Sequence, residues 1–294
     1  MKTWSNGKII TGRKNIDSLN FSLHYANPVI WEGIRAYRQK DGKTKIWKLE
    51  EHINRLFDSA KIVNTEIPYG KKEIIAACEA VVKANGGGDF YLRPIAYSSQ
   101  DAESAKAKQS NISVDIYCFP IPALYKPKAE GIKVKISNII RSYPQFQMQA
   151  KTSANYSVIY PNKNELTASG IDDLLVTDNQ GFIVEATVAN IWVFKGDKAM
   201  TPPNNGSILP GITRQCVMDI LKNTELMTRH NLSPQVMEKP ITKADLYTAD
   251  GVILCGTYAE IVNVSEIDGR KIGDAQTHSY YKVLREEYGR MVRA

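Results

Sequence analysis

The sequence contains few cysteines and histidines, and neither kind is grouped. Four histidines are scattered along the 294 residues, and the four cysteines lie equally far apart, without a CxxC pair: Cys78, Cys118, Cys216 and Cys255. Zinc sites and disulfide frameworks require such residues at short, repeated spacings. The pattern therefore favours reduced, buried cysteines and argues against a bound metal.

The sequence also lacks long apolar runs. No stretch is apolar enough to span a bilayer, and the polar N-terminal segment MKTWSNGKIITGRKNID lacks the apolar core of a secretory signal. The mean hydropathy of −0.32 is typical of a soluble globular protein. We therefore expect a cytoplasmic protein that does not bind membranes.

Positive charge is in modest excess. The formal net charge is +7 and the pI is about 9.0, yet lysines are mixed with acids, as in KKEIIAACEAVVK. Proteins that bind nucleic acids gather their basic residues into patches or stripes. We therefore expect no nucleic-acid partner, although a modest positive field would attract small carboxylates or phosphates.

The first half of the chain alternates between helical and extended patterns. Apolar residues recur at helical spacing over 49–63, and a second predicted helix begins at residue 71 and ends at the glycines before residue 88. Apolar and aromatic residues then predict strands over 91–97 and 114–119. These elements predict a small domain that contains both helices and strands.

The composition changes after residue 119, where FPIPALYKPKAEG contains three prolines. Proline disfavours both helices and central strands, so we place an interdomain connection at 121–131. It would separate a smaller N-terminal α/β domain (1–120) from a larger C-terminal domain (132–294). Further strands are predicted at 133–137, 173–194 and 251–256, with a helix after ILPGITR. The predicted class is α+β (mixed α/β), in two domains.

Two turns have the composition of anion-binding sites. In SILPGITR, Pro210 and Gly211 precede the predicted helix, whose first turn would present backbone N–H groups and the positive end of the helix dipole. In CGTYAE, Gly256 and Thr257 follow a strand, and a glycine lets a ligand approach the backbone closely. Each turn alone is equally consistent with a simple cap or loop.

Four further residues carry groups with useful chemistry. Lys151 lies among small polar residues in QAKTSANYSV, Tyr156 follows five residues later, and Glu185 ends an apolar strand. Arg55 lies opposite the apolar stripe of its helix. An amine, a carboxylate and a phosphate cradle are the groups that a pyridoxal phosphate enzyme needs. From the residues alone, ordinary surface lysine, arginine and carboxylate side chains remain an alternative interpretation.

The chain resembles the class IV, or fold type IV, pyridoxal-phosphate aminotransferases, and among them the branched-chain amino acid aminotransferases. The matching segments occur in family order, almost from end to end: WEGIRAY, LEEHINRLFDSAKI, YLRPIAY, AKTSANY, FIVEATVANIWVF, TPPNNGSILPGITR and CGTYAEI. The resemblance implies the two-domain fold type IV architecture and pyridoxal 5′-phosphate as cofactor. It also implies a homodimer or a higher homo-oligomer, with active sites near the subunit interface.

The resemblance implies roles for residues on the cofactor side. Lys151 would form the Schiff base and then move a proton between the substrate Cα and the cofactor C4′. Glu185 would pair with the protonated ring nitrogen, Tyr156 would hydrogen-bond the ring hydroxyl, and Leu209 would pack on the ring. The remaining cofactor-binding residues, mainly around the phosphate, would be Arg55, Ile212, Thr213, Gly256 and Thr257.

On the substrate side, the resemblance implies ping-pong transamination of branched-chain L-amino acids with 2-oxoglutarate. The products would be branched 2-oxo acids and glutamate. One pocket must then accept both an apolar side chain and a second carboxylate, and Arg93 could serve the carboxylate. The implied substrate-binding residues are Tyr25, Trp31, Arg35, Tyr91, Arg93, Thr257 and Tyr258.

Three departures from the family pattern touch this substrate side. HYANPVIWEG replaces a glycine-rich HYGTGVFEG-like stretch, with one extra residue, a proline, and with Trp31 for the usual phenylalanine. Ala189 stands where a second glutamate is common, and Tyr258 replaces a usual small residue in the carboxylate turn. The cofactor side is nearly intact, so these changes bear on the choice of substrate.

Several alternatives remain open. A D-amino acid aminotransferase or a 4-amino-4-deoxychorismate lyase would share the fold and the cofactor, although WEGIRAY and YLRPIAY favour the branched-chain type. A non-catalytic binding protein could keep the fold, but it would have no need of the complete set of cofactor residues. Nucleic-acid binding has only the net charge in its favour, and it predicts strongly salt-sensitive association.

Overall fold

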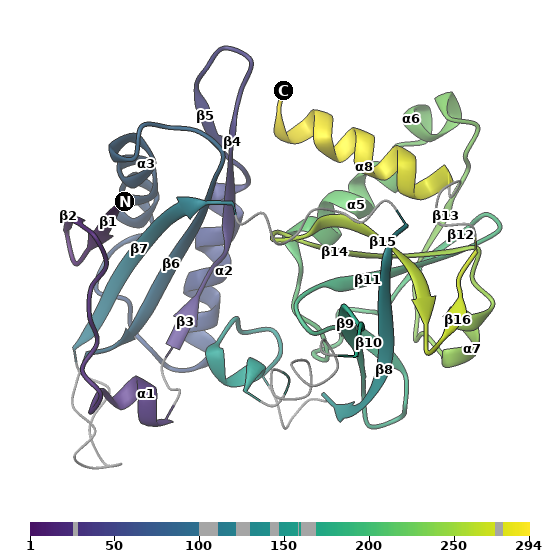
Figure 1. The fold of residues 1–294 in the computed structure, drawn as a ribbon, viewed down its shortest axis with the longest axis horizontal. Coiled ribbons are helices and arrows are strands. Elements are labelled where there is room, and N and C mark those ends of the chain that lie inside the picture. The colour runs from purple at the N-terminus through teal and green to yellow at the C-terminus, as the bar shows by residue number, and fades with distance from the viewer. Residues whose placement is uncertain are drawn as a thin grey trace. The chain divides into compact units, whose positions relative to one another are not determined.

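The chain forms two compact units in the computed structural model (Figure 1). Unit 1 contains residues 1–123, 150–155 and 292–294, and unit 2 contains 124–149 and 156–291. The predicted connection at 121–131 falls largely outside the described part of the chain. The structure describes residues 1–25, 29–99, 111–121, 130–141, 147–157, 159, 169–273 and 279–294.

Unit 1 is built on a seven-stranded sheet with the order β2-β1-β7-β6-β4-β5, and β3 also pairs with β6. Its central pair, β6 and β7, is antiparallel over nine residues in each strand. The helices of this unit are α1 (Phe21–Tyr25), α2 (Leu49–Ile62) and α3 (Lys71–Ala84). The strands are β1 (Lys2–Ser5), β2 (Lys8–Thr11), β3 (Val29–Trp31), β4 (Ile34–Arg38), β5 (Thr44–Ile46), β6 (Phe90–Ser98) and β7 (Ile112–Pro120).

Helices α2 and α3 cover one face of this sheet, as Figure 1 shows. Successive side chains of a strand point to opposite faces, so Leu92 and Ala96 of β6 enter the apolar core with the helices. Tyr91 and Arg93, at the alternate positions, lie on the other face. The sheet thereby presents aromatic and basic side chains on the side away from α2 and α3.

Helix α2 buries a polar row in addition to its apolar stripe. Ile53 and Leu56 are fully buried in the core. His52 and Ser59 are also buried, and the side chain of Arg55 is only 11% exposed. Residues three and four apart share one side of a helix, so 52, 55 and 59 form a continuous row. The prediction of a helix here is confirmed, but Arg55 is not a solvated surface arginine.

Unit 2 is built on a nine-stranded mixed sheet with the order β10-β9-β8-β15-β14-β11-β12-β13, and β16 pairs with β15. Its parallel pairs are β8 with β9, β8 with β15 and β12 with β13. The strands are β8 (Ile132–Ile140), β9 (Asp173–Thr177), β10 (Ile183–Ala186), β11 (Asn190–Lys195), β12 (Lys198–Thr201), β13 (Gln235–Glu238), β14 (Gly251–Gly256), β15 (Glu260–Ile267) and β16 (Arg270–Lys271).

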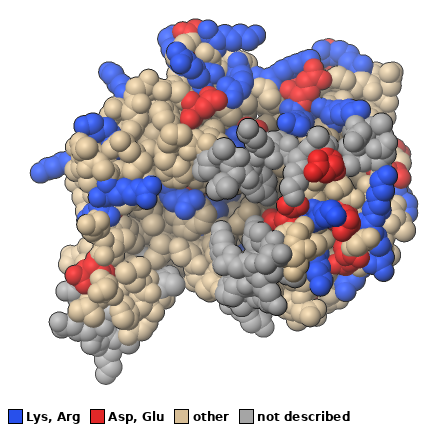
Figure 2. Space-filling model, viewed as in Figure 1, with Lys and Arg blue, Asp and Glu red and all other residues tan. Residues whose placement is uncertain are grey.

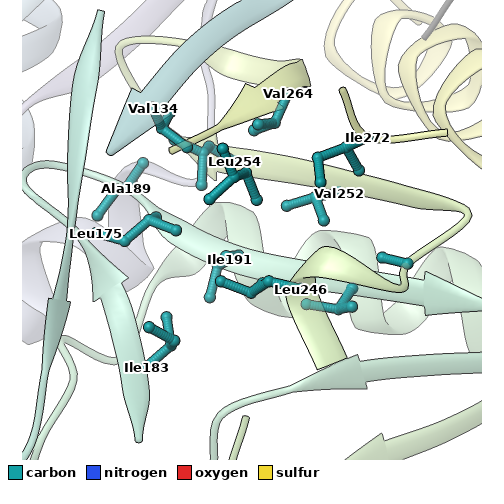
Figure 3. Close-up of a cluster of buried hydrophobic side chains, with 14 of the residues drawn as sticks. Val134, Leu175, Ile183, Ala189, Ile191, Leu246, Val252, Leu254, Val264 and Ile272 are labelled. Atoms are coloured by element: carbon teal, nitrogen blue, oxygen red, sulfur yellow. The ribbon is translucent and has the colours of Figure 1, made fainter. Parts of the chain in front are cut away.

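An apolar cluster from several strands forms the main core of unit 2, and Figure 3 shows how its side chains converge. Leu254 of β14 and Ile191 of β11 pair directly across the sheet and are both buried. Further helices are α5 (Ile212–Lys222), α6 (Thr224–Arg229), α7 (Lys243–Tyr247) and α8 (Ser279–Val292), and the 3-10 helix η2 spans Ser153–Tyr156. Leu246 of α7 completes the cluster.

The cysteines and the surface charges agree with the sequence pattern. All four cysteines are free and buried, and burial raises the pKa of the Cys118 and Cys255 thiols to about 12. Figure 2 shows lysine and arginine side chains spread over the face in view, with aspartate and glutamate among them. No helix within the described ranges is long and apolar enough to cross a membrane.

Candidate active site

Lys151 is held in unit 1 by backbone contacts on both sides. Its N–H donates to Ser59 Oγ of α2 at 2.9 Å, and its carbonyl accepts from the N–H of Trp31 at 3.2 Å. The next residue, Thr152, forms an isolated bridge with Ile30. The Lys151 side chain is half-buried, and its Nζ lies 4.0 Å from the centroid of the Trp31 ring. The backbone of the lysine is therefore fixed, and its amine lies over the face of the Trp31 ring.

Arg93 lies over the same aromatic residue. Its Cζ is 4.6 Å from the centroid of the Trp31 ring and 5.6 Å from that of the Tyr91 ring. Within the described part of the chain, Arg93 Nε is buried and has no hydrogen-bond partner. Aromatic rings attract the positive charge of a guanidinium without using its N–H donors, which can then bind a carboxylate. Arg93 thus has the surroundings of an anion-binding arginine.

The side chain of Tyr91 explains why residue 33 in the WEGIRAY segment is a glycine. A Cβ added to Gly33 would lie 1.8 Å from the hydroxyl oxygen of Tyr91, so only glycine leaves room for that tyrosine. Tyr91 is buried, and burial raises the pKa of its hydroxyl despite the nearby Arg93. Arg35, opposite Tyr91 in the β4–β6 pair, is buried as well. Three of the predicted substrate residues, Arg35, Tyr91 and Arg93, therefore lie on adjacent strands.

Arg55 belongs to a buried ion-pair group with Glu32 and His52, which no local sequence pattern indicates. Glu32 is wholly buried, and it accepts from Arg55 Nε at 2.6 Å and from Arg55 Nη2 at 2.8 Å. His52 Nδ1 lies 2.8 Å from the same carboxylate. Burial by itself would raise the pKa of Glu32, but the charge of Arg55 and the hydrogen bonds from Arg55 and His52 hold that pKa far below 4.5. Glu32 is therefore a permanent anion between two donors.

Glu185 has a comparable set of partners in unit 2. Its side chain is 5% exposed, and Oε1 lies 3.3 Å from Nη1 of the buried Arg141. Oε2 accepts from Asn190 Nδ2 at 3.0 Å and from the backbone N–H of Leu209 at 3.2 Å. The Arg141 contact has the geometry of an ion pair rather than of an aligned hydrogen bond. A carboxylate held by so many donors is fixed in position for a cationic group.

Asn190 links Glu185 to the turn before α5. Its Nδ2 also donates to the Leu209 carbonyl at 3.1 Å, and a Cβ on Gly211 would lie 1.8 Å from its Oδ1. Gly211 is the N-cap of α5 and contributes no side-chain hydrogen bond to it. The first turn of α5, with Ile212 and the buried Thr213, therefore starts directly beside this ordered turn. Such a helix start favours an anion.

The second glycine turn joins β14 to β15. Gly256 and Glu260 pair across the hairpin, and the loop consists of Thr257, Tyr258 and Ala259. A Cβ on Gly256 would lie 3.2 Å from the carbonyl oxygen of Val188, so the backbone of β14 is closely approached there. Thr257 and Tyr258 are partly exposed.

The predicted site residues divide between the two units. Unit 1 holds Arg55 and Lys151 with Trp31, Arg35, Tyr91 and Arg93, and it also holds Tyr25, which is 45% exposed at the end of α1. The extra proline, Pro28, lies outside the described residues. Unit 2 holds the other predicted residues: Tyr156, Glu185, Leu209, Ile212, Thr213, Gly256, Thr257 and Tyr258.

Comparison with known proteins identifies the family. Residues 30–267 match the family model described as amino-transferase class IV. The chain is 33% identical over 293 residues to a probable branched-chain-amino-acid aminotransferase of Rickettsia felis, covering 99% of this chain and 95% of the relative. The chain therefore belongs to the class IV aminotransferases, and the family predicted from the sequence is confirmed.

Solved structures confirm the predicted fold. A crystal structure of a branched-chain aminotransferase from Thermoproteus uzoniensis with norvaline has a TM-score of 0.89 at 32% identity, covering 99% of this chain and 94% of that one. A T.th. branched-chain amino acid aminotransferase complexed with N-(5′-phosphopyridoxyl)-L-glutamate has a TM-score of 0.86 at 29% identity, covering 99% and 93%. The two-sheet, mixed α/β architecture is thus that of this enzyme group.

Proposed function

We propose that this aminotransferase moves the amino group of branched-chain L-amino acids to 2-oxoglutarate, with pyridoxal 5′-phosphate as its cofactor. One observation carries the proposal: the Lys151 backbone, the Glu185 carboxylate and the Arg55 guanidinium are each held by a buried partner. They occur in a chain similar over its full length to enzymes named for branched-chain amino acids. The norvaline and phosphopyridoxyl-glutamate of the two solved structures support an apolar and an acidic substrate in turn.

The chemistry of the described residues fits the cofactor. Arg55 and the first turn of α5, at Ile212 and Thr213, offer cationic and N–H donors to a phosphate. Glu185, kept rigid by its own partners, suits a protonated ring nitrogen, and the Tyr156 hydroxyl suits the ring hydroxyl. Leu209 and the turn at Gly256 and Thr257 would complete the cofactor surroundings. When bound, the cofactor supplies an electron sink for the bond changes at the substrate Cα.

Lys151 would carry the proton in each half-reaction. Its amine would take a proton from the substrate Cα in one direction and return it in the other, while its backbone stays fixed to Ser59 and Trp31. A general base gains from such fixation because the proton donor and acceptor must meet at hydrogen-bonding distance. The amino acid would leave as its 2-oxo acid before 2-oxoglutarate enters, which is a ping-pong sequence.

The proposed substrate residues would serve both substrates, and four of them, Trp31, Arg35, Tyr91 and Arg93, lie on the sheet of unit 1. Arg93 would receive the second carboxylate of 2-oxoglutarate or glutamate, while the ring surfaces of Trp31 and Tyr91 would contact an aliphatic side chain. Tyr258 and Thr257 would lie at the α-carboxylate, with Arg35 and Tyr25 completing the set. Trp31 is larger than the usual phenylalanine, so it would favour the smaller branched side chains.

A visible spectrum of the purified protein tests this function. We expect a yellow absorption band that fades when L-leucine is added and returns with 2-oxoglutarate. Lys151→Ala should fold but lose the band, because no amine is left to bind the cofactor aldehyde. A band that ignores L-leucine and responds to a D-amino acid or to aminodeoxychorismate would redirect the assignment within the fold. Ordinary turnover by Lys151→Ala would refute the role of the lysine.

A further inference from the structure

We propose that Glu32 and His52 are positioning residues that set the direction in which Arg55 presents its guanidinium to the cofactor phosphate. The inference rests on the proposed phosphate-binding role of Arg55 and adds two residues to which no role in this reaction has been given. It concerns a buried group that lies entirely within unit 1.

The contact between Glu32 and Arg55 is side-on. Nε and Nη2 donate to different oxygens of one carboxylate, at 2.6 and 2.8 Å. A paired contact of this kind fixes both the plane and the rotation of a guanidinium, whereas a single contact would fix neither. One edge of Arg55 is therefore locked against Glu32, and the direction of the opposite edge follows from it.

Glu32 is itself held by two further hydrogen bonds, one from its main chain and one to its carboxylate, which makes it a firm support. Its main-chain N–H donates to the Pro94 carbonyl at 2.9 Å, and its Oε2 accepts from the Gly33 N–H at 3.3 Å. The carboxylate has no exposed surface. Leaving an ion in such a place without partners would be costly, and this cost favours the contact between Glu32 and Arg55.

His52 completes the support from the same helix as Arg55. Burial lowers the pKa of His52 even though Glu32 acts to raise it, so the ring is neutral at neutral pH. Because Glu32 is ionised and can only accept, the proton of the neutral ring must lie on Nδ1. His52 therefore adds a donor without adding a second positive charge beside Glu32, and the full positive charge in the group stays on Arg55.

Positioning and charge make opposite predictions for Glu32→Gln. The carboxylate neutralises part of the charge of Arg55, so its removal would strengthen phosphate binding if charge alone mattered. If the carboxylate matters because it orients Arg55, its removal should weaken phosphate binding. The structure favours orientation, because two donors of Arg55 bond different oxygens of one carboxylate, and such a two-point contact fixes the rotation of the guanidinium as well as its distance.

The test compares two aldehydes on cofactor-free protein. Pyridoxal phosphate and pyridoxal differ only in the phosphate, and the capture of each by the protein can be titrated by its absorption. For Glu32→Gln we expect the Kd of pyridoxal phosphate to rise about 10- to 100-fold, by analogy with the range found when a residue that orients a metal ligand is removed. The Kd of pyridoxal should change less than about twofold, because it makes no phosphate contact. A loss of folding would instead raise the Kd of both ligands by a similar factor.

Matched variants separate the possible outcomes. Glu73→Gln removes another carboxylate of unit 1, which accepts from the Gly70 N–H at 2.7 Å, and it should leave the ratio of the two Kd values unchanged. His52→Leu should shift the ratio in the same direction as Glu32→Gln, but less, and it serves as the test if Glu32→Gln does not fold. A ratio that is unchanged or improved in Glu32→Gln or, failing that, in His52→Leu would overturn the inference.

Arg55→Gln distinguishes this inference from the function on which it rests. Loss of the preference for pyridoxal phosphate in Arg55→Gln, with the preference kept in Glu32→Gln, would refute positioning and leave the phosphate role of Arg55 intact. A preference that survives Arg55→Gln would refute both. Loss of the preference in both variants, with pyridoxal capture unchanged, is the expected result.

Discussion

The ion pair between Arg141 and Glu185 should be the largest single electrostatic support in unit 2. Both side chains are almost fully buried, at 3% and 5% exposure, and their charged atoms lie 3.3 Å apart. Removing one member of such a pair leaves the other ion without compensation, which typically costs about 3–5 kcal/mol. For a domain of 150–250 residues, each kcal/mol lowers Tm by about 2–4 °C. Arg141→Met should therefore lower Tm of the cofactor-free protein by about 6–20 °C.

A double-mutant cycle provides the decisive measurement. Glu185→Gln keeps the approximate shape of the side chain and removes its charge, so the double variant Arg141→Met/Glu185→Gln contains neither ion. It should be more stable than Arg141→Met alone, with a coupling energy of at least about 1 kcal/mol from urea denaturation at equal m values. The control cycle uses Glu73→Gln in place of Glu185→Gln. The effects of Glu73→Gln and Arg141→Met on the free energy of unfolding should be additive. Additive effects within about 0.5 kcal/mol for Arg141 and Glu185 would refute the reasoning.

Three further outcomes are expected. Gly211→Ala should reduce activity and stability together, because its Cβ would displace the Asn190 amide from Glu185; unchanged kcat and Tm would contradict this. The free energy of unfolding should decrease as the pH is lowered below 6.5, by up to about 1.4 kcal/mol per pH unit. The reason is that His52 takes up a proton in the unfolded chain at a higher pH than in the folded protein, where its pKa is lowered. His52→Gln should flatten that slope just below pH 6.5, where ordinary carboxyls are still ionised. Light scattering should give about twice 32.9 kDa, and a monomer would refute the proposed homodimer.

Periodic patterns predicted most of the elements that carry the candidate site. Helix α2 and strands β6, β14 and β9–β11 lie where apolar spacing placed them, because burial of one face enforces a period in the sequence. The N-terminal hairpin was missed, although Asn6-Gly7 between two short strands is the usual turn signal, and both residues have positive φ. The polar residues of β1 and β2 obscured that signal. Helix α8 was missed as well.

The buried charges were much harder to predict. Glu32 and Arg55 are 23 residues apart, and nothing in either local pattern shows that they meet side-on. Arg141 follows β8 immediately, and its partner Glu185 lies on β10, so their contact depends on how distant strands are ordered in the sheet. A charge looks the same in sequence whether it faces water or a buried partner. This is why Arg55 alone suggested a solvated side chain, whereas the structure places it in an ion-pair group.

The division of unit 1 along the chain has a consequence for biosynthesis. Residues 1–123 leave the ribosome first, but the segment 150–155 with Lys151 follows only after part of unit 2, and residues 292–294 come last. At about 5–20 residues per second, the lysine segment is made on the order of seconds after residue 123. In the meantime Ile30 of β3 lacks its bridge to Thr152, and the Ser59 hydroxyl lacks the Lys151 N–H that it accepts from. A gene fragment ending at residue 123 should therefore yield a unit that lacks Lys151 and leaves Ile30 of β3 without its bridge to Thr152.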